Sequence, residues 1–91
     1  MLYKTKGTCS TAINFEVDGD TLKEVAFTGG CNGNLQGISR LVKGKKIDDI
    51  IATLEGISCG GRPTSCPDQL ARALKQYKEL QKAYLRISPW L

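Results

Sequence analysis

The spacing of hydrophobic residues along this chain changes once, at Gly29-Gly30, and this change limits the folds open to it. Before these glycines apolar and polar residues alternate, which is typical of half-buried β-strands. After them apolar residues recur every three or four positions, which is typical of amphipathic helices. Strands followed by helices favour an α+β fold with the helices on one face of a small antiparallel sheet. The predicted elements are a hairpin with strands at 12–17 and 22–28, and helices at about 34–43, 46–55 and 67–85.

The predicted hairpin lies in the stretch TAINFEVDGDTLKEVAFTGG. Ile13 and Phe15 alternate with polar residues in the first strand, and Val25 begins a similar alternation in the second. Asp18-Gly19-Asp20 supplies the turn between them. The stretch LYKT near the N-terminus is a candidate for a third short strand.

Each predicted helix has an apolar stripe that we expect to face the core. Gly44 and Gly56 follow the first two helices as stop signals, and Pro67 begins the third at a position that proline tolerates. The stripes consist of Leu35, Ile38, Leu41 and Val42; of Ile47, Ile50, Ile51 and Leu54; and of Leu70, Ala73, Leu74 and Tyr77, with Leu80 or Tyr84 as a further candidate.

The chain has the size and composition of one small domain, and we expect residues 1–91 to form it. Its hydrophobic share of 41% and charged share of 24% are ordinary for a globular protein. It contains no apolar run near the roughly 20 residues that span a membrane, and its first residues lack the apolar region of a secretory signal. We therefore expect a cytoplasmic protein without a membrane partner. In that compartment several cysteines bind metal more often than they form disulfides.

Four cysteines stand in turn-forming sequence, whereas buried structural thiols usually lie among apolar residues. They are Cys9, Cys31, Cys59 and Cys66. Because the chain has no histidine, a soft-metal site would consist of sulfur, or of sulfur and carboxylate. Four thiolates suit tetrahedral zinc or iron. Their spacing includes no C-x-x-C pair, so four unrelated structural thiols are an equal alternative, and a disulfide between Cys59 and Cys66 is a third.

Cys66 directly precedes Pro67 and is predicted to be the N-cap residue of the last helix. At that position the free backbone N–H groups and the positive end of the helix dipole would stabilise a thiolate. We therefore expect Cys66 to ionise most readily of the four in the metal-free protein. Asp68 is interpreted as a stabiliser of the first helical turn rather than as an acid catalyst.

Little in the sequence supports catalysis, because no histidine can act as a general base and the carboxylates are scattered. The stretch TGGCNGN precedes a helix, as phosphate-binding loops do, but it lacks the Lys-Ser/Thr of a P-loop. The net charge of +4 leaves a nucleotide or nucleic-acid site as a further alternative, although nucleic acid is not the expected partner. Such a site would use Lys43, Lys45, Lys46 and Arg62.

The string TSCPD at positions 64–68 resembles the TSCPD family, which is named for it. The resemblance extends over almost the whole chain through GGCNGNLQGISRLVKG, IIATLEGISCGGR and DQLARAL. Members of that family occur as small stand-alone proteins and as the C-terminal module of adenosylcobalamin-dependent ribonucleotide reductases. The resemblance implies metal binding through the four cysteines. A chain of 91 residues cannot hold the reductase barrel, so any role in ribonucleoside-diphosphate reduction would be accessory.

A second similarity is to U-type iron–sulfur scaffold proteins. Their pattern is a cysteine before a hairpin, Gly-Cys after it, a helix, a GK turn, a second helix, and a cysteine that opens a long helix. Cys9, Cys31 and Cys66 follow this order here, and Cys59 would supply a fourth ligand. The scaffolds carry Gly-Asp after the first cysteine, where this chain has Ser10-Thr11. The similarity therefore implies a related fold more strongly than a shared function.

Together these observations predict a small metal-binding module that holds zinc, or alternatively iron, and works with a protein partner rather than as an enzyme alone. The alternatives are an iron–sulfur or sulfur-transfer scaffold, and a nucleotide-binding module.

Overall fold

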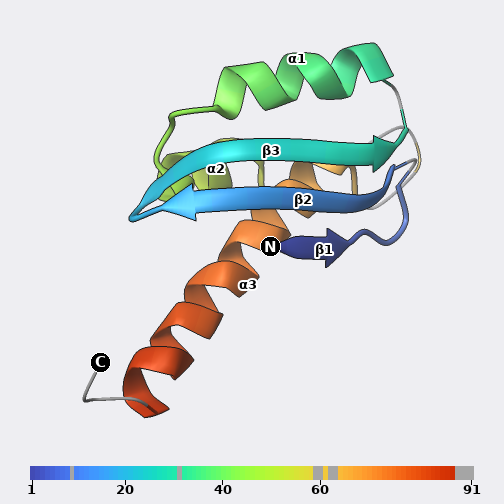
Figure 1. The fold of residues 1–91 in the computed structure, drawn as a ribbon. Helices are drawn as coiled ribbons and strands as arrows, with labels where there is room; N and C mark the ends of the chain where they lie inside the picture. Colours follow the sequence, from blue (N-terminus) through green and yellow to red (C-terminus); the bar gives the residue numbers. More distant parts are fainter. Residues whose placement is uncertain (9, 31, 59–60, 62–63, 88–91) are drawn as a thin grey trace.

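The computed structural model describes residues 1–8, 10–30, 32–58, 61 and 64–87; the side chains of residues 32 and 83–87 are outside this description. In the described part of the chain three strands are followed by three helices (Figure 1). The α+β fold predicted from the change in hydrophobic spacing is confirmed, and LYKT contains a third strand. The elements are β1 (Leu2–Lys4), β2 (Ser10–Asp18), β3 (Thr21–Gly29), α1 (Asn32–Val42), α2 (Ile47–Leu54) and α3 (Cys66–Ile87).

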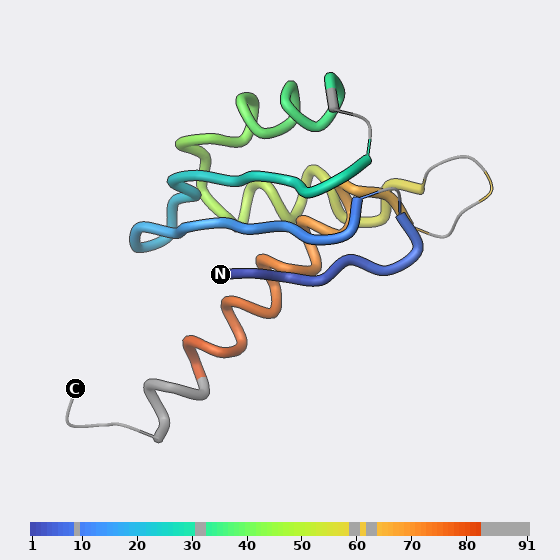
Figure 2. The backbone as a smooth tube through the Cα atoms, turned by 45° about the vertical axis from the view of Figure 1, so that its right-hand side comes forward, coloured from blue at the N-terminus to red at the C-terminus, as the bar shows by residue number. Residues whose placement is uncertain are grey.

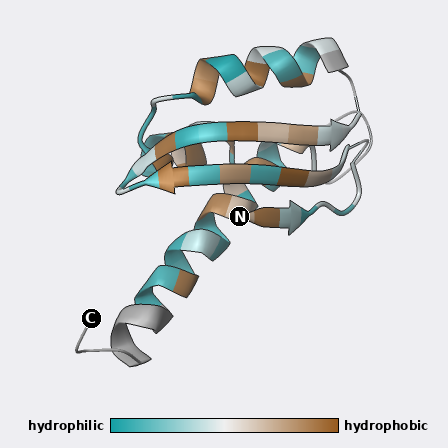
Figure 3. Ribbon diagram, viewed as in Figure 1, coloured by the Kyte–Doolittle hydropathy of each residue, from teal (hydrophilic) through white to brown (hydrophobic). Residues whose placement is uncertain are grey.

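The sheet is antiparallel and has the order β1-β2-β3. Ile13 is paired with Phe27 and Phe15 with Val25, which places the apolar residues of both strands on one face. The alternation of hydrophilic and hydrophobic residues along β2 and β3 is visible in Figure 3. Gly19 has a φ of 64°, which suits the first position of the two-residue turn between these strands.

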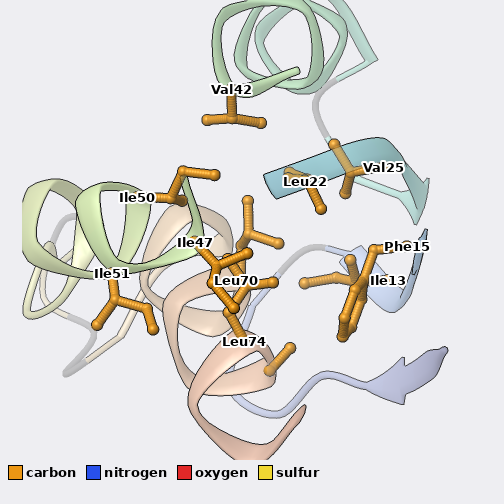
Figure 4. Packing of buried hydrophobic residues seen from close by; sticks show 11 residues of the cluster. Ile13, Phe15, Leu22, Val25, Val42, Ile47, Ile50, Ile51, Leu70 and Leu74 are labelled. Carbon is orange, nitrogen blue, oxygen red and sulfur yellow. The ribbon is translucent and has the colours of Figure 1, made fainter. Parts of the chain in front are cut away.

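The core lies between this face of the sheet and the helices (Figure 4). α1 packs against β3, whereas α2 packs against α3. The ring of Phe15 meets that of Tyr77 edge to face, with the centroids 6.1 Å apart. The buried cluster consists of Ile13, Phe15, Leu22, Val25, Val42, Ile47, Ile50, Ile51, Leu70, Ala73 and Leu74.

Two residues of the predicted apolar stripes are exposed instead of buried. Leu41 is 75% exposed, because α1 turns Leu35 and Val42 toward the core and leaves this side chain outside it. Leu80 is 51% exposed, because α3 runs on past the sheet (Figure 1). The side chain of Tyr84 is outside the described part.

The predicted N-cap of α3 is wrong by one residue. The carbonyl of Ser65 accepts the first helical hydrogen bond, from the N–H of Gln69 at 2.8 Å. The hydroxyl of Ser65 accepts a hydrogen bond from the N–H of Asp68 at 3.2 Å, as an N-cap side chain does. Ser65 is therefore the N-cap and Cys66 is the first helical residue. A hydroxyl oxygen is a better acceptor than a thiol, which explains why the helix begins here.

Candidate metal centre

Cys66 is half-buried at the first position of α3. Its Sγ lies 3.2 Å from Oγ of Ser10, the first residue of β2. Ser10 is 3% exposed and is paired with Gly29, the last residue of β3. Cys66 therefore lies at the open end of the hairpin, away from the turn. The other three predicted ligands are outside the described residues, namely Cys9, Cys31 and Cys59.

Described neighbours of all four predicted ligands line one pocket of about 490 Å³. Its lining includes Cys66 itself and three residues one or two positions from the other cysteines, namely Thr8, Gly33 and Ser58. The chain segments that lead to the four cysteines thus reach the same pocket, although they are far apart in the sequence. Within the described residues no three Asp, Glu or Cys side chains lie together as metal ligands would.

Two helices begin at this pocket. Gly33 and Asn34 of α1 line it, and so do Cys66 and Pro67 of α3. The first turn of a helix carries the positive end of its dipole. The first turn of α1 contains no acidic residue that would offset this charge. The backbone around the pocket therefore favours negative charge, including that of a thiolate.

Asp68 is the centre of a buried hydrogen-bond network beside the pocket. Its side chain is 2% exposed. Oδ1 accepts a hydrogen bond from the N–H of Gly56 at 2.7 Å, which ties the end of α2 to the start of α3. Oδ2 accepts hydrogen bonds from the hydroxyl of Thr64 and from Nε of Arg72, the latter at 2.9 Å. The carboxylate therefore joins the segment after α2, the segment before α3 and α3 itself by hydrogen bonds.

The pKa of Asp68 is nevertheless governed by opposing effects. Burial raises this pKa, but the hydrogen bonds from Thr64 and Gly56 and the positive charge of Arg72 together bring it below its ordinary value. The group is thus a carboxylate at neutral pH, and its role is to accept hydrogen bonds.

The network extends to the segment before Cys9. Nε2 of Gln69 donates a hydrogen bond to the hydroxyl of Thr64 at 3.0 Å, and Oε1 of Gln69 accepts one from the N–H of Lys6 at 3.1 Å. Ser65 adds a further bond, because its hydroxyl donates to the carbonyl of Ile57 at 2.6 Å. Four of the five residues of the TSCPD string thus interact at one junction. Thr64, Ser65 and Asp68 form its hydrogen bonds, and Cys66 contacts Ser10.

Sequence reasoning missed this network and assigned Asp68 only to the helix dipole. The Ser-x-x-Asp spacing from Ser65 to Asp68 resembles a capping box and could have indicated the N-cap. The i,i+4 spacing of Asp68 and Arg72 could likewise have indicated their ion pair. Nothing local in the sequence indicates the hydrogen bond from Gly56, because it depends on how α2 and α3 meet.

Gly7 brings the N-terminal segment close to Thr64, and its replacement should lower stability. A Cβ at this position would lie 3.2 Å from Cγ2 of Thr64, and the φ of Gly7 is 74°. We expect Gly7→Ala to lower the free energy of unfolding by about 1–2 kcal/mol in urea titrations. Gly37→Ala is the matched control, because Gly37 is inside α1 with open space around it; a gain of about 0.5–1 kcal/mol is expected there. Equal effects of the two changes would contradict the close approach at Gly7.

The basic turn is at the other end of the sheet. The carbonyl of Lys45 accepts a hydrogen bond from the N–H of Leu22, and Lys46 forms a β-bridge with Thr21, both beside the hairpin turn. Nine residues of strand, about 30 Å, separate this end from Ser10 and Cys66. Arg62 is outside the described residues. The basic turn predicted for an anion site therefore lies at the opposite end of the sheet from Cys66.

The fold and the site define a small α+β domain in which segments that lead to four cysteines line one pocket beside a hydrogen-bonded junction. The family model for the TSCPD domain matches residues 1–78, and the chain belongs to this family. No curated protein and no solved structure matches the chain. None of the described helices combines the length and the apolar character needed to cross a membrane.

Proposed function

We propose that the chain is a metal-binding module that holds one zinc ion through Cys9, Cys31, Cys59 and Cys66. The observation that supports this proposal is that Cys66 and described neighbours of the other three cysteines line a single pocket. Four thiolates complete a tetrahedral shell, the arrangement of structural zinc sites. If the four cysteines were unrelated structural thiols, nothing would require their chain neighbours to line the same pocket.

The electrostatics of the pocket fit such a centre. Zinc with four thiolates carries a net charge of about −2. The N-termini of α1 and α3 both face the pocket, and the chain has a net charge of +4. Both features favour the thiolate form of the ligands, which metal binding requires.

The role we propose for the metal is structural. Zinc has no redox chemistry of its own, and four protein ligands leave no open position for a substrate. The protein would then act through a partner, and we extend the proposal to an accessory part in ribonucleotide reduction, on the basis of the family resemblance alone.

The second candidate is an iron–sulfur or sulfur-transfer scaffold. The observed order of hairpin, α1, α2 and long α3 is the order expected from the resemblance to U-type proteins. Ser10 favours the zinc module over the scaffold. It is buried against Cys66 in the part of the chain where the scaffolds have Gly-Asp. This chain thus offers no carboxylate at that place.

The test is to purify the protein without oxygen and to measure its metals and its visible spectrum. We expect colourless protein with about one zinc per chain. Cys66→Ser should lose most of the metal, whereas Ser58→Ala, a change in the same pocket that removes no thiol, should keep it. Brown protein with iron would favour the scaffold. Failure of the wild-type protein to bind zinc or iron, or equal metal content in both variants, would refute the metal site.

A further inference from the structure

An apolar groove runs between α1 and the α2 side of the molecule. It consists of the pocket beside Cys66 and a second pocket of about 390 Å³, and the two share Ile38 and Leu41 of α1. Its opposite wall is formed by Leu54 and, near the Cys66 end, by Ile57. The groove exists because α1 packs on β3 while α2 packs on α3, so the two helices leave space between them.

The groove leaves large apolar side chains in contact with water. Leu41 is 75% exposed and Ile57 is 40% exposed. Scattered single apolar residues are common on protein surfaces, but these two line one continuous groove. A groove of this kind between helices suits the apolar side of an amphipathic helix.

The distal end of α3 is a helix of this kind. The helix continues to Ile87. Its coloured part in Figure 2 already extends away from the sheet and the other helices, as it does in Figure 1. Its last ion pair to another element joins Lys78 to Asp48 of α2 in the described part of the chain. The side chains of residues 79–82 are exposed, including Leu80 at 51%. The backbone from 79 to 87 thus continues the helix for about 13 Å, and the side chains of 79–82 are not covered by the rest of the described molecule.

Because this segment continues a packed helix it needs no new nucleus, but the exposed side chains of 79–82 add little packing energy of their own. In the sequence, Tyr77, Leu80, Tyr84 and Ile87 recur at intervals of three and four residues. In the sequence this is the spacing of a helix with one apolar side.

We propose that the distal end of α3 in one copy of this chain binds in the groove between α1 and α2 of a second copy. The lengths agree, since α1 has 11 residues and thus spans about 16 Å. The charges also agree: the groove carries Asp49 and Lys45 at its edge, and the helix end carries Lys82 and Glu79. One contact of this kind would cover three of the exposed large apolar side chains, those of Leu41, Ile57 and Leu80. A reciprocal exchange of helix ends gives a closed dimer.

The full-length protein tests this proposal by sedimentation velocity at increasing concentration. We expect a reversible dimer, and at least tenfold weaker association for Leu80→Glu and for Leu41→Glu, because each change places a charge in the apolar contact. Both side chains are more than half exposed, so the variants should fold, which circular dichroism can verify. Leu2→Glu is the matched control: Leu2 is 63% exposed but is on β1, and dimerisation should not change.

Mixing the two variants distinguishes this contact from other kinds of self-association. The Leu80→Glu protein keeps a normal groove, and the Leu41→Glu protein keeps a normal helix end. An equimolar mixture should therefore form a one-to-one complex that neither variant forms alone. The proposal is refuted if the wild type stays monomeric up to about 1 mM, if the mixture does not associate, or if Leu80→Glu prevents dimerisation while Leu41→Glu does not. The last result would indicate pairing of two α3 ends instead.

Discussion

Replacement of Asp68 by asparagine should lower the free energy of unfolding by about 3 kcal/mol at neutral pH. The asparagine side chain keeps one acceptor oxygen and replaces the other by an NH2 donor. This NH2 must then face either the N–H of Gly56, or the hydroxyl of Thr64 and Nε of Arg72. Most of the loss should come from the buried donors, since Arg72 is 54% exposed and its ion pair is weakened by solvent. Domains of this size have a total stability of about 5–15 kcal/mol, so the variant would lose a large part of it.

The matched control for this change is Asp49→Asn. Asp49 is also in the first turn of a helix, but its side chain is exposed at the start of α2. The loss expected there is below about 1 kcal/mol, the size of an exposed dipole interaction. Urea unfolding of both variants measures the difference. If the two losses are equal, Asp68 acts only on the helix dipole and its hydrogen-bond network adds nothing to stability.

The pH dependence provides an independent measurement on the same carboxylate. The pKa of Asp68 is raised by burial, but the hydrogen bonds from Thr64 and Gly56 and the charge of Arg72 outweigh this and lower it below the ordinary 3.8. The unfolded chain therefore takes up this proton more readily than the folded protein. The contribution of Asp68 is fully present above about pH 4 and is lost as the pH falls through the lowered folded-state value. The stability difference between wild type and Asp68→Asn should therefore shrink on acidification below pH 4.

The strands and α2 were predictable from local patterns, because each pattern has one consistent solution. The alternation around Ile13 and Phe15 allows only one face of a strand to be apolar, and the structure buries that face. Ile47, Ile50 and Ile51 likewise fix the inner side of α2. These predictions needed no knowledge of which other element would cover the apolar face.

The failures occur where the answer depends on a neighbouring element. Leu41 fits the stripe of α1, but whether that part of the stripe is covered depends on the distance between α1 and α2. Asp68 has donors from Gly56, just after α2, and from Thr64, just before α3, which no spacing within α3 reveals. The N-cap was misplaced because two adjacent residues, Ser65 and Cys66, both precede the helix, and only the observed bond to Asp68 selects the serine. The convergence of the four cysteines stays a prediction.

Removal of metal should have the second large effect, because a zinc ion bound by four thiolates would join segments that are far apart in the chain. Structural zinc can supply most of the folding free energy of a small domain. This domain also has a buried core and the Asp68 network, so we expect the metal-free protein to remain folded but to be less stable. A loss of about 2–4 kcal/mol corresponds to a fall of roughly 10–20 °C in Tm for a domain of this length. Thermal unfolding with and without a chelator measures this fall.

A cysteine variant identifies the origin of the fall in Tm. Cys66→Ser should melt near the temperature of the chelated wild type, and chelator should change its Tm little, because the site has already lost a ligand. Ser58→Ala removes a hydroxyl from the same pocket and should respond to chelator as the wild type does. Asp68→Asn should also respond to chelator, because its network stabilises the junction without binding metal. A metal-loaded wild type whose Tm is unchanged by chelator would contradict a stabilising zinc site, and an unchanged response in Cys66→Ser would exclude this cysteine as a ligand.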